Sequence, residues 1–112
     1  MIVRRGDVWL VDFGEPVGRE QSARRPAIVI SADAMNEGPS RLVVVVPITS
    51  TRRGLPSHVE LDHPDTGLDT IGYAKCEDLK SISERRLISR LGIIAGVNLI
   101  EIERNLRYLL DL

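Results

Sequence analysis

The chain has 112 residues, with 15 Lys or Arg against 16 Asp or Glu, and its formal net charge is −1. This length fits one domain, expected over residues 1–112, and a charge near zero argues against binding nucleic acid through bulk charge alone. A single cysteine, Cys76, argues against a disulfide scaffold and for a reducing, cytoplasmic setting, and the sequence has no apolar run of about 18 residues that would span a membrane.

The first predicted strand covers residues 7–13, where apolar residues fall on both faces, so we expect both faces to contact apolar side chains. Residues 14–23 contain two glycines and a proline, which predicts a loop. A β-branched strand follows at 26–31 and begins with Pro26, which is tolerated at the first residue of a strand. Because the proline restricts Arg25 to extended geometry, the direction of this arginine side chain is expected to be fairly fixed.

A turn is predicted at 36–41, and a continuous apolar strand follows at 42–48. We expect this strand to be buried on both sides. Pro47 has no N–H to donate, so regular pairing should fail or bulge at that residue. The strand leads into a basic loop at 51–56.

The segment 57–62 alternates between apolar and polar residues, which predicts another strand. A loop at 63–69 separates it from the later strands, and a polar turn at 83–86 is predicted between the last two of them. Further short strands are expected at 71–79, 80–82 and 87–94. Within 57–62, the alternation places Val59 and Leu61 inward and His58, Glu60 and Asp62 outward.

Apolar residues recur at helical spacing near the end of the chain, which predicts a helix over about residues 98–110. Asn98 and Glu101 are three residues apart, as in a capping box at the start of a helix. Many short strands and one terminal helix indicate a mainly β (α+β) fold, a small, partly closed antiparallel barrel with a C-terminal helix packed on it.

Two residues at strand ends are candidates for binding phosphate. Arg25 carries a planar guanidinium, which can bind two phosphate oxygens at once, although a single arginine in this position also fits a surface residue that covers the strand end. Thr49 could donate its hydroxyl to a phosphate oxygen, or the backbone could satisfy that hydroxyl.

Three charged residues are candidates for proton transfer. Glu20 could act as a general base or orient Arg25, or it could form a solvated ion pair of little energetic weight. Lys75 and Glu77 fall on the same face of a predicted strand, with Cys76 on the other face. They could serve as acid and base on one substrate, or form a charged pair on a solvated face.

The two histidines do not predict a metal site. His58 and His63 are five residues apart and have no third ligand nearby. Both are expected to be exposed, and His58 could stack on a nucleobase or hydrogen-bond to it. Cys76 is expected to be a small buried residue rather than a nucleophile.

Four segments, taken together and in this order, resemble the MazF/PemK (Kid) family of toxin endoribonucleases: "RRGDVWLVDF", "GREQSARRPAIVIS", "VVVVPITS" and "CEDLKSI". The resemblance covers nearly the whole chain. It implies an SH3-like, partly open barrel of the CcdB/PemK type and a homodimer. It also implies sequence-selective cleavage of single-stranded RNA without a metal or other cofactor, by attack of the ribose 2′-OH to give a 2′,3′-cyclic phosphate and a 5′-OH end. A cognate antitoxin, partly disordered before binding, would hold the toxin inactive.

The resemblance also implies roles for individual residues. Arg25 matches the arginine of the family's R-P motif, Thr49 the threonine of its P-x-T-S motif, and Glu20 the glutamate after the loop glycine. Lys75 and Glu77 stand where Kid-type toxins carry arginine and aspartate. Arg19 replaces the histidine of the first Kid loop. The residues expected to bind RNA are Arg19, Gln21, Arg24, Ser50, Arg52, Arg53 and His58.

Some alternatives stay open at this stage. Glu20 and Glu77 compete as the general base, because burial would raise the pKa of a carboxyl group and nearby arginines would lower it. A CcdB-like toxin that inhibits DNA gyrase without catalysis, or a catalytically silent SH3-like interaction module, would share the same scaffold.

Overall fold

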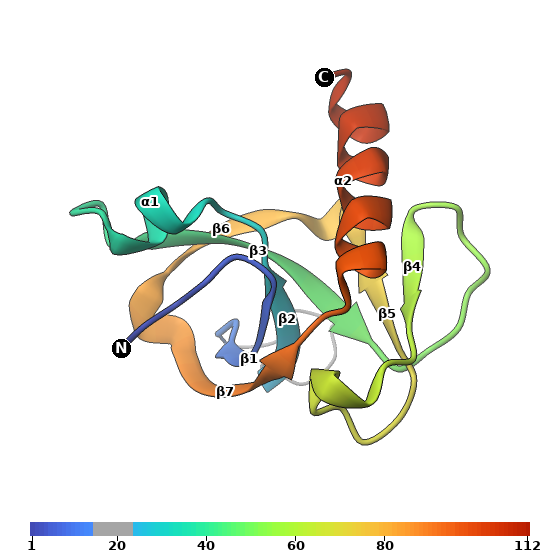
Figure 1. Ribbon diagram of the computed structural model, residues 1–112, viewed down its shortest axis with the longest axis horizontal. Helices are drawn as coiled ribbons and strands as arrows, with labels where there is room; N and C mark the ends of the chain where they lie inside the picture. The colour runs from blue at the N-terminus through green and yellow to red at the C-terminus, as the bar shows by residue number, and fades with distance from the viewer. Residues whose placement is uncertain (15–23) are drawn as a thin grey trace.

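A computed structural model describes residues 1–14 and 24–112. Their strands form an antiparallel sheet in the order β4-β5-β3-β2-β1-β7, and a seventh strand, β6, pairs with β3 (Figure 1). No pairing joins β4 to β7 among the described residues, so the barrel is open, as expected. The elements are β1 (Asp7–Asp12), β2 (Arg24–Val29), α1 (Asp33–Glu37), β3 (Leu42–Thr49), β4 (His58–Leu61), η1 (Pro64–Thr66), β5 (Gly72–Lys75), η2 (Cys76–Asp78), β6 (Lys80–Ser83), η3 (Glu84–Arg86), β7 (Leu87–Ile93) and α2 (Gly96–Leu110).

Strand β3 changes partner at Pro47. Its first half pairs with β6 as far as Val45, and its end pairs with β5 from Ile48 onward. Proline cannot donate to a strand ladder, so the predicted failure of regular pairing is confirmed on this edge. On the other edge Pro47 lies opposite Ala27 of β2.

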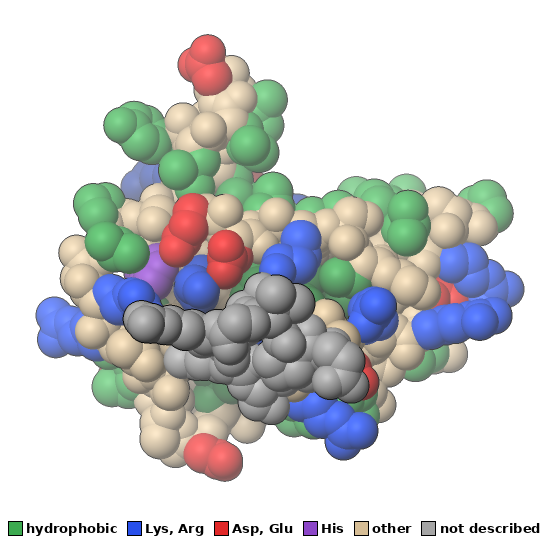
Figure 2. Space-filling view, turned by 180° about the vertical axis from the view of Figure 1, so that it is seen from behind, with side chains coloured by type: hydrophobic (Ala, Val, Ile, Leu, Met, Phe, Trp, Pro, Cys, Tyr) green, Lys and Arg blue, Asp and Glu red, His purple; other side chains and the backbone are tan. Residues whose placement is uncertain are grey.

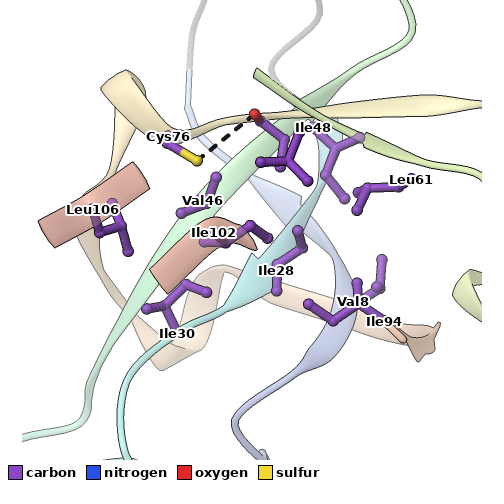
Figure 3. Close-up of a cluster of buried hydrophobic side chains, with 12 residues drawn as sticks. Val8, Ile28, Ile30, Val46, Ile48, Leu61, Cys76, Ile94, Ile102 and Leu106 are labelled. Atoms are coloured by element: carbon purple, nitrogen blue, oxygen red, sulfur yellow. Dashed lines mark hydrogen bonds between the residues drawn. The ribbon is translucent and has the colours of Figure 1, made fainter. Parts of the chain in front are cut away.

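The sheet has a hydrophobic core on each face because its central strands alternate two sets of apolar side chains. Strands β1, β2 and β3 contribute to both cores, as predicted for 7–13 and 42–48. The helix-side core, covered by α2, contains Val8, Ile28, Ile30, Val46, Ile48, Val59, Leu61, Ala74, Cys76, Ile94, Ile102 and Leu106 (Figure 3). The second core contains Val3, Trp9, Val11, Ala27, Val29, Val43, Val45, Ile82 and Leu87.

We expect Ile102→Ala to lower the free energy of unfolding by about 3 kcal/mol. Ile102 is fully buried where α2 crosses the sheet, so its truncation leaves a cavity that the helix cannot easily fill (Figure 3). Urea denaturation measures the loss. Ile88→Ala on β7 is the control, because Ile88 is 42% exposed and should lose less than about 1 kcal/mol. Equal losses in the two variants would contradict the packing of α2.

The start of α2 differs from the prediction. The helix begins at Gly96, and the carbonyl oxygen of Ala95 accepts the amide N–H groups of Asn98 and Leu99. Asn98 therefore lies inside the helix, where its Nδ2–H donates to the Glu101 carboxylate (3.1 Å) and to the Glu60 carbonyl (3.3 Å). The predicted capping box is therefore wrong, because backbone groups already start the helix two residues earlier.

The segment predicted only as a turn at 36–41 begins with the end of a short helix, α1. Asn36 is buried in this helix, where its Nδ2 donates to the carbonyl of Ser31 (3.1 Å). A single turn of helix leaves no repeating apolar pattern, so periodicity could not find it. None of the described helices is long and apolar enough to cross a membrane.

Candidate active site

One row of side chains crosses the sheet on the face of the second core. Thr49 of β3 pairs with Tyr73 of β5, and Tyr73 pairs with Glu60 of β4. On the other edge of β3, continuing the Ala27–Pro47 register by two residues places Arg25 opposite Thr49. Directly paired residues share a face of an antiparallel sheet. Arg25, Thr49, Tyr73 and Glu60 therefore form the cross-strand row.

The Arg25 guanidinium lies over an aromatic ring at one end of this row. Its central carbon is 5.6 Å from the centroid of Phe13, and the Lys80 ammonium is 5.1 Å from the same ring. Cation–π attraction thus orients both positive groups. The Arg25 Nε atom is buried and has no hydrogen-bond partner among the described residues, so one donor of this side chain remains unused.

Thr49 makes the backbone contact that the sequence allowed, and donation to a phosphate oxygen stays a prediction. Its side chain is nearly buried (5% exposed), and its Oγ1 accepts the amide N–H of Thr51 (3.2 Å). Because the oxygen acts as an acceptor for the backbone, the hydroxyl proton is left to donate elsewhere. No acceptor for it lies within hydrogen-bond distance in the described part of the chain.

Strand β5 ends at Lys75, which corrects the predicted strand at 71–79. Residues Cys76–Asp78 turn into η2, so Lys75 and Glu77 do not stand side by side on one strand. Cys76 faces the helix-side core, and burial raises the pKa of its thiol to about 11. The thiol is therefore protonated at neutral pH, consistent with a small buried residue rather than a nucleophile.

Lys75 pairs with Asp78 rather than with Glu77. The Lys75 Nζ and Asp78 Oδ2 atoms are 2.8 Å apart. This hydrogen bond, with added attraction from Lys75, Lys80 and Arg25, lowers the pKa of Asp78 although partial burial opposes the shift. Asp78 is thus a counter-ion for the cations near the cross-strand row. Pattern reasoning missed it, because the three-residue spacing from Lys75 matters only in a helical turn.

Glu77 is held by two other side chains. Its Oε2 atom is 2.9 Å from His58 Nε2, and its Oε1 atom accepts the Ser57 hydroxyl at 2.9 Å. Partial burial raises the pKa of Glu77, but hydrogen bonds from His58, the backbone and Ser57 outweigh it and lower the pKa overall. Ser57 was not among the predicted site residues, and nothing in its local sequence separates it from an ordinary strand-end serine.

His58 is buried, which corrects the expectation that it is exposed. Its side chain is only 3% exposed, and its Nδ1 atom has no hydrogen-bond partner among the described residues. Alternation placed His58 on the polar face of β4 correctly, but it could not show that Glu77 would fold back over the ring. His63 is exposed, as expected.

We expect Glu77→Gln to destabilise the fold at pH 7 and to match the wild type at low pH. The pKa of Glu77 is lowered from 4.5 in the folded protein, so its ionised form adds stability above about pH 4.5. That stability is lost as the pH falls through the lowered pKa. Glu77 is 36% exposed, so solvent screening keeps the effect to about 1 kcal/mol or less.

Thermal unfolding of both proteins between pH 3 and 7 measures this difference. Glu37→Gln, at an exposed position in α1, is the control and should track the wild type throughout. A constant gap between Glu77→Gln and the wild type over the whole range would contradict the ionised network.

Two cavities flank the cross-strand row. The first, of about 420 Å³, is lined by Arg25, Thr49 and Ser50 together with apolar residues such as Leu10 and Ile48. Residues 67–72 and Leu91 complete the lining of this cavity. The second, of about 240 Å³, is lined by Arg52, Gly54, Leu55, His58, Glu60 and Tyr73.

The other predicted RNA-binding residues are either exposed at the strand ends or lie outside the residues that the structure describes. Arg24 is exposed at the start of β2, and Ser50, Arg52 and Arg53 are exposed after β3. The view in Figure 2 shows Lys and Arg side chains mixed with Asp and Glu on one face, so the charge there is not of a single sign. Three predicted site residues lie outside the described residues: Arg19, Glu20 and Gln21.

Within residues 1–14 and 24–112, no group of three or more His, Cys, Asp or Glu side chains is arranged to hold a metal ion. The absence of a resident metal stays a prediction from the resemblance.

Comparison with known proteins gives one consistent family. A family model described as "PemK-like, MazF-like toxin of type II toxin-antitoxin system" matches residues 4–110. Endoribonuclease MazF9 of Mycobacterium tuberculosis is 34% identical over 116 residues, covering 99% of this chain and 98% of that protein.

Solved structures agree with this result. MazF from Deinococcus radiodurans superimposes with a TM-score of 0.85 at 29% identity, covering 100% of this chain and 99% of that one. An endoribonuclease from a mycobacterial species, solved in complex with its cognate antitoxin, gives a TM-score of 0.82 at 26% identity, with 98% and 96% covered.

Proposed function

This chain belongs to the family of PemK-like, MazF-like toxins of type II toxin–antitoxin systems, and we propose that it is an endoribonuclease that cleaves single-stranded RNA. The observation that carries the proposal is that Arg25 and Thr49 line one cavity, on neighbouring strands whose register, continued by two residues, places them opposite each other. The guanidinium is oriented by Phe13, and neither its Nε–H nor the Thr49 hydroxyl proton has an acceptor among the described residues. Two preoriented donors beside a cavity suit a phosphodiester.

In the proposed reaction the ribose 2′-OH attacks the adjacent phosphorus. A base removes the 2′ proton, the P–O5′ bond breaks, and an acid protonates the leaving 5′ oxygen. The products are a 2′,3′-cyclic phosphate and a 5′-OH end, and no outside co-reactant is needed. Arg25 and Thr49 would stabilise the negative charge that grows on the phosphorane oxygens, and one well-placed donor of this kind contributes about 3–4 kcal/mol. DNA lacks the 2′-OH and would not be cut.

The contacts of Glu77 favour Glu20 as the base. Both Glu77 oxygens already accept hydrogen bonds, and the pKa of Glu77 is lowered, whereas a general base works best with a pKa near the working pH. Lys75 lies near Arg25 through their shared counter-ion, Asp78. We assign Lys75 to binding or protonating the RNA strand and Glu77 to holding His58 in place.

We also propose that the protein is cytoplasmic, forms a homodimer and is neutralised by a partly disordered antitoxin. The mycobacterial relative solved with its antitoxin supports the last point. Most of the apolar run at 42–48 is buried within the protomer and is not free to form a dimer interface. Support for the dimer therefore rests on α2. There Val97, Ile100 and Leu110 are each more than half exposed. Sedimentation should give a dimer at micromolar concentration, and a monomer would contradict the proposal.

The test of the activity is incubation with a mixed RNA pool in EDTA. We expect fragments that end in a 2′,3′-cyclic phosphate and begin with a 5′-OH, which ligation-based sequencing detects. Intact RNA with inhibition of DNA gyrase instead would point to the CcdB-like alternative.

A further inference from the structure

The 240 Å³ cavity lies at the Glu60 end of the cross-strand row, opposite the Arg25 end. Glu60 and Tyr73 line it, and Tyr73 is the direct neighbour of Thr49 on the next strand. Neighbouring strands are about 4.8 Å apart, so Glu60 lies roughly 10 Å across the sheet from Thr49. A base attached next to a phosphate bound at Thr49 would be within reach of this cavity.

The cavity combines an aromatic ring, a cation and a carboxylate. Tyr73 is half-buried, while Arg52 and Glu60 are exposed at the cavity wall. In the described part of the chain, neither the Arg52 guanidinium nor the Glu60 carboxylate makes a hydrogen bond or an ion pair, not even with each other. By contrast, Glu77 has both oxygens occupied. Two opposite charges at one cavity, neither paired within residues 1–14 and 24–112, suit a ligand that presents donors and acceptors together.

We infer that this cavity is a guanine subsite for the RNA substrate, an inference that rests on the proposed function. Guanine presents N1–H and the 2-amino group side by side, which match the two oxygens of Glu60. Its O6 and N7 acceptors match the fork of an arginine, here Arg52. Tyr73 supplies a face for stacking, as in other single-strand RNA sites.

The other bases fit this set of groups less well. Adenine and cytosine offer a carboxylate only one amino group, and uracil offers one imide N–H between two carbonyls that a carboxylate would repel. Guanine satisfies the carboxylate with two donors and the arginine with two acceptors. Glu60 and Arg52 are therefore residues that determine which nucleotide lies near the cut.

The test begins with the sequences at the 5′-OH ends made from a mixed RNA pool, where guanine should be fixed at one position near the cut. A short RNA with that guanine is then compared with one that carries inosine, which lacks the 2-amino group. Wild-type kcat/KM should fall about 10-fold on inosine. In Glu60→Gln, the guanine substrate should lose about 10-fold or more, and the guanine-to-inosine ratio should shrink to about 2 or less.

Asp62→Asn is the matched control, because Asp62 is an exposed carboxylate two residues further along that does not line this cavity. Its guanine-to-inosine ratio should equal that of the wild type. Binding is measured separately from cleavage with 2′-deoxy oligonucleotides, which cannot be cut. One carries guanine and the other inosine, and fluorescence anisotropy gives the affinity of each.

Cleavage with no fixed guanine, or a guanine-to-inosine ratio unchanged by Glu60→Gln, would overturn the guanine subsite and leave the nuclease proposal intact. Guanine-selective binding that Glu60→Gln removes, without cleavage of any RNA, would support the subsite and overturn the nuclease proposal.

Discussion

Arg25→Ala should lower the rate of RNA cleavage by about 10²–10³-fold while the protein stays folded. The variant removes the guanidinium that faces Thr49 across neighbouring strands and takes away the stabilisation of the phosphorane. The Arg25 Nε atom has no hydrogen-bond partner among the described residues, so truncation leaves no buried group unpaired. The free energy of unfolding should therefore change by no more than about 1 kcal/mol.

Single-turnover cleavage of a short RNA and urea denaturation measure the two effects. Arg85→Ala, at an exposed arginine of η3, is the matched control and should retain full activity. Arg25→Lys should recover only part of the rate, because an ammonium is a point charge without the planar fork of arginine. If the Arg25→Ala variant is folded and cleaves RNA at the wild-type rate, the proposed role of Arg25 is wrong.

Gly92→Ala should destabilise the fold by about 3 kcal/mol or more. A Cβ atom at Gly92 of β7 would lie 2.1 Å from the Asp65 carbonyl oxygen and 2.6 Å from the Thr66 carbonyl carbon. Both are backbone atoms of η1, so no side chain can rotate to make room. The strand and the 3₁₀ helix would have to separate.

Gly96→Ala is the control, because a Cβ atom at Gly96 would meet no atom within 4 Å. Alanine at this first residue of α2 should leave stability unchanged or raise it by up to about 1 kcal/mol. The melting temperature should therefore fall strongly in Gly92→Ala and stay the same or rise in Gly96→Ala. Similar melting temperatures would show that β7 and η1 are not in close contact.

The strands could be predicted because their patterns are local. Alternation in 7–13 and 57–62 and the continuous apolar run at 42–48 predicted which side chains enter the cores, and the structure confirms these faces. Pro47 predicted the break in strand pairing, because a residue without an N–H cannot donate to a ladder. These inferences needed only the two-residue period of a strand.

The polar contacts could not be predicted because they depend on a chain reversal. Cys76 begins a 3₁₀ turn, and that turn sends Glu77 to His58 and Asp78 back to Lys75. A short apolar and charged segment fits a strand and a turn equally well. The burial of His58 and the roles of Ser57 and Asp78 all follow from this one turn.

The candidate pair, Arg25 and Thr49, is a different case. Motif resemblance selected both residues, but only the register between β2 and β3, continued by two residues, places them opposite each other. Strand pairing joins residues far apart in sequence, so no local pattern reports it. Glu20 lies outside the described residues, so the choice of Glu20 as the base rests on the contacts of its competitor, Glu77.

The change of partner along β3 has a consequence for the dynamics of the molecule. Strand β3 pairs with β2 on one edge, and with β6 and then β5 on the other, so the amides of its middle residues lie between paired strands. Their exchange with deuterium should report the global free energy of unfolding rather than local fraying. Thr49 is the last residue of this strand, so the proposed phosphate-binding hydroxyl is attached directly to a central strand of the sheet.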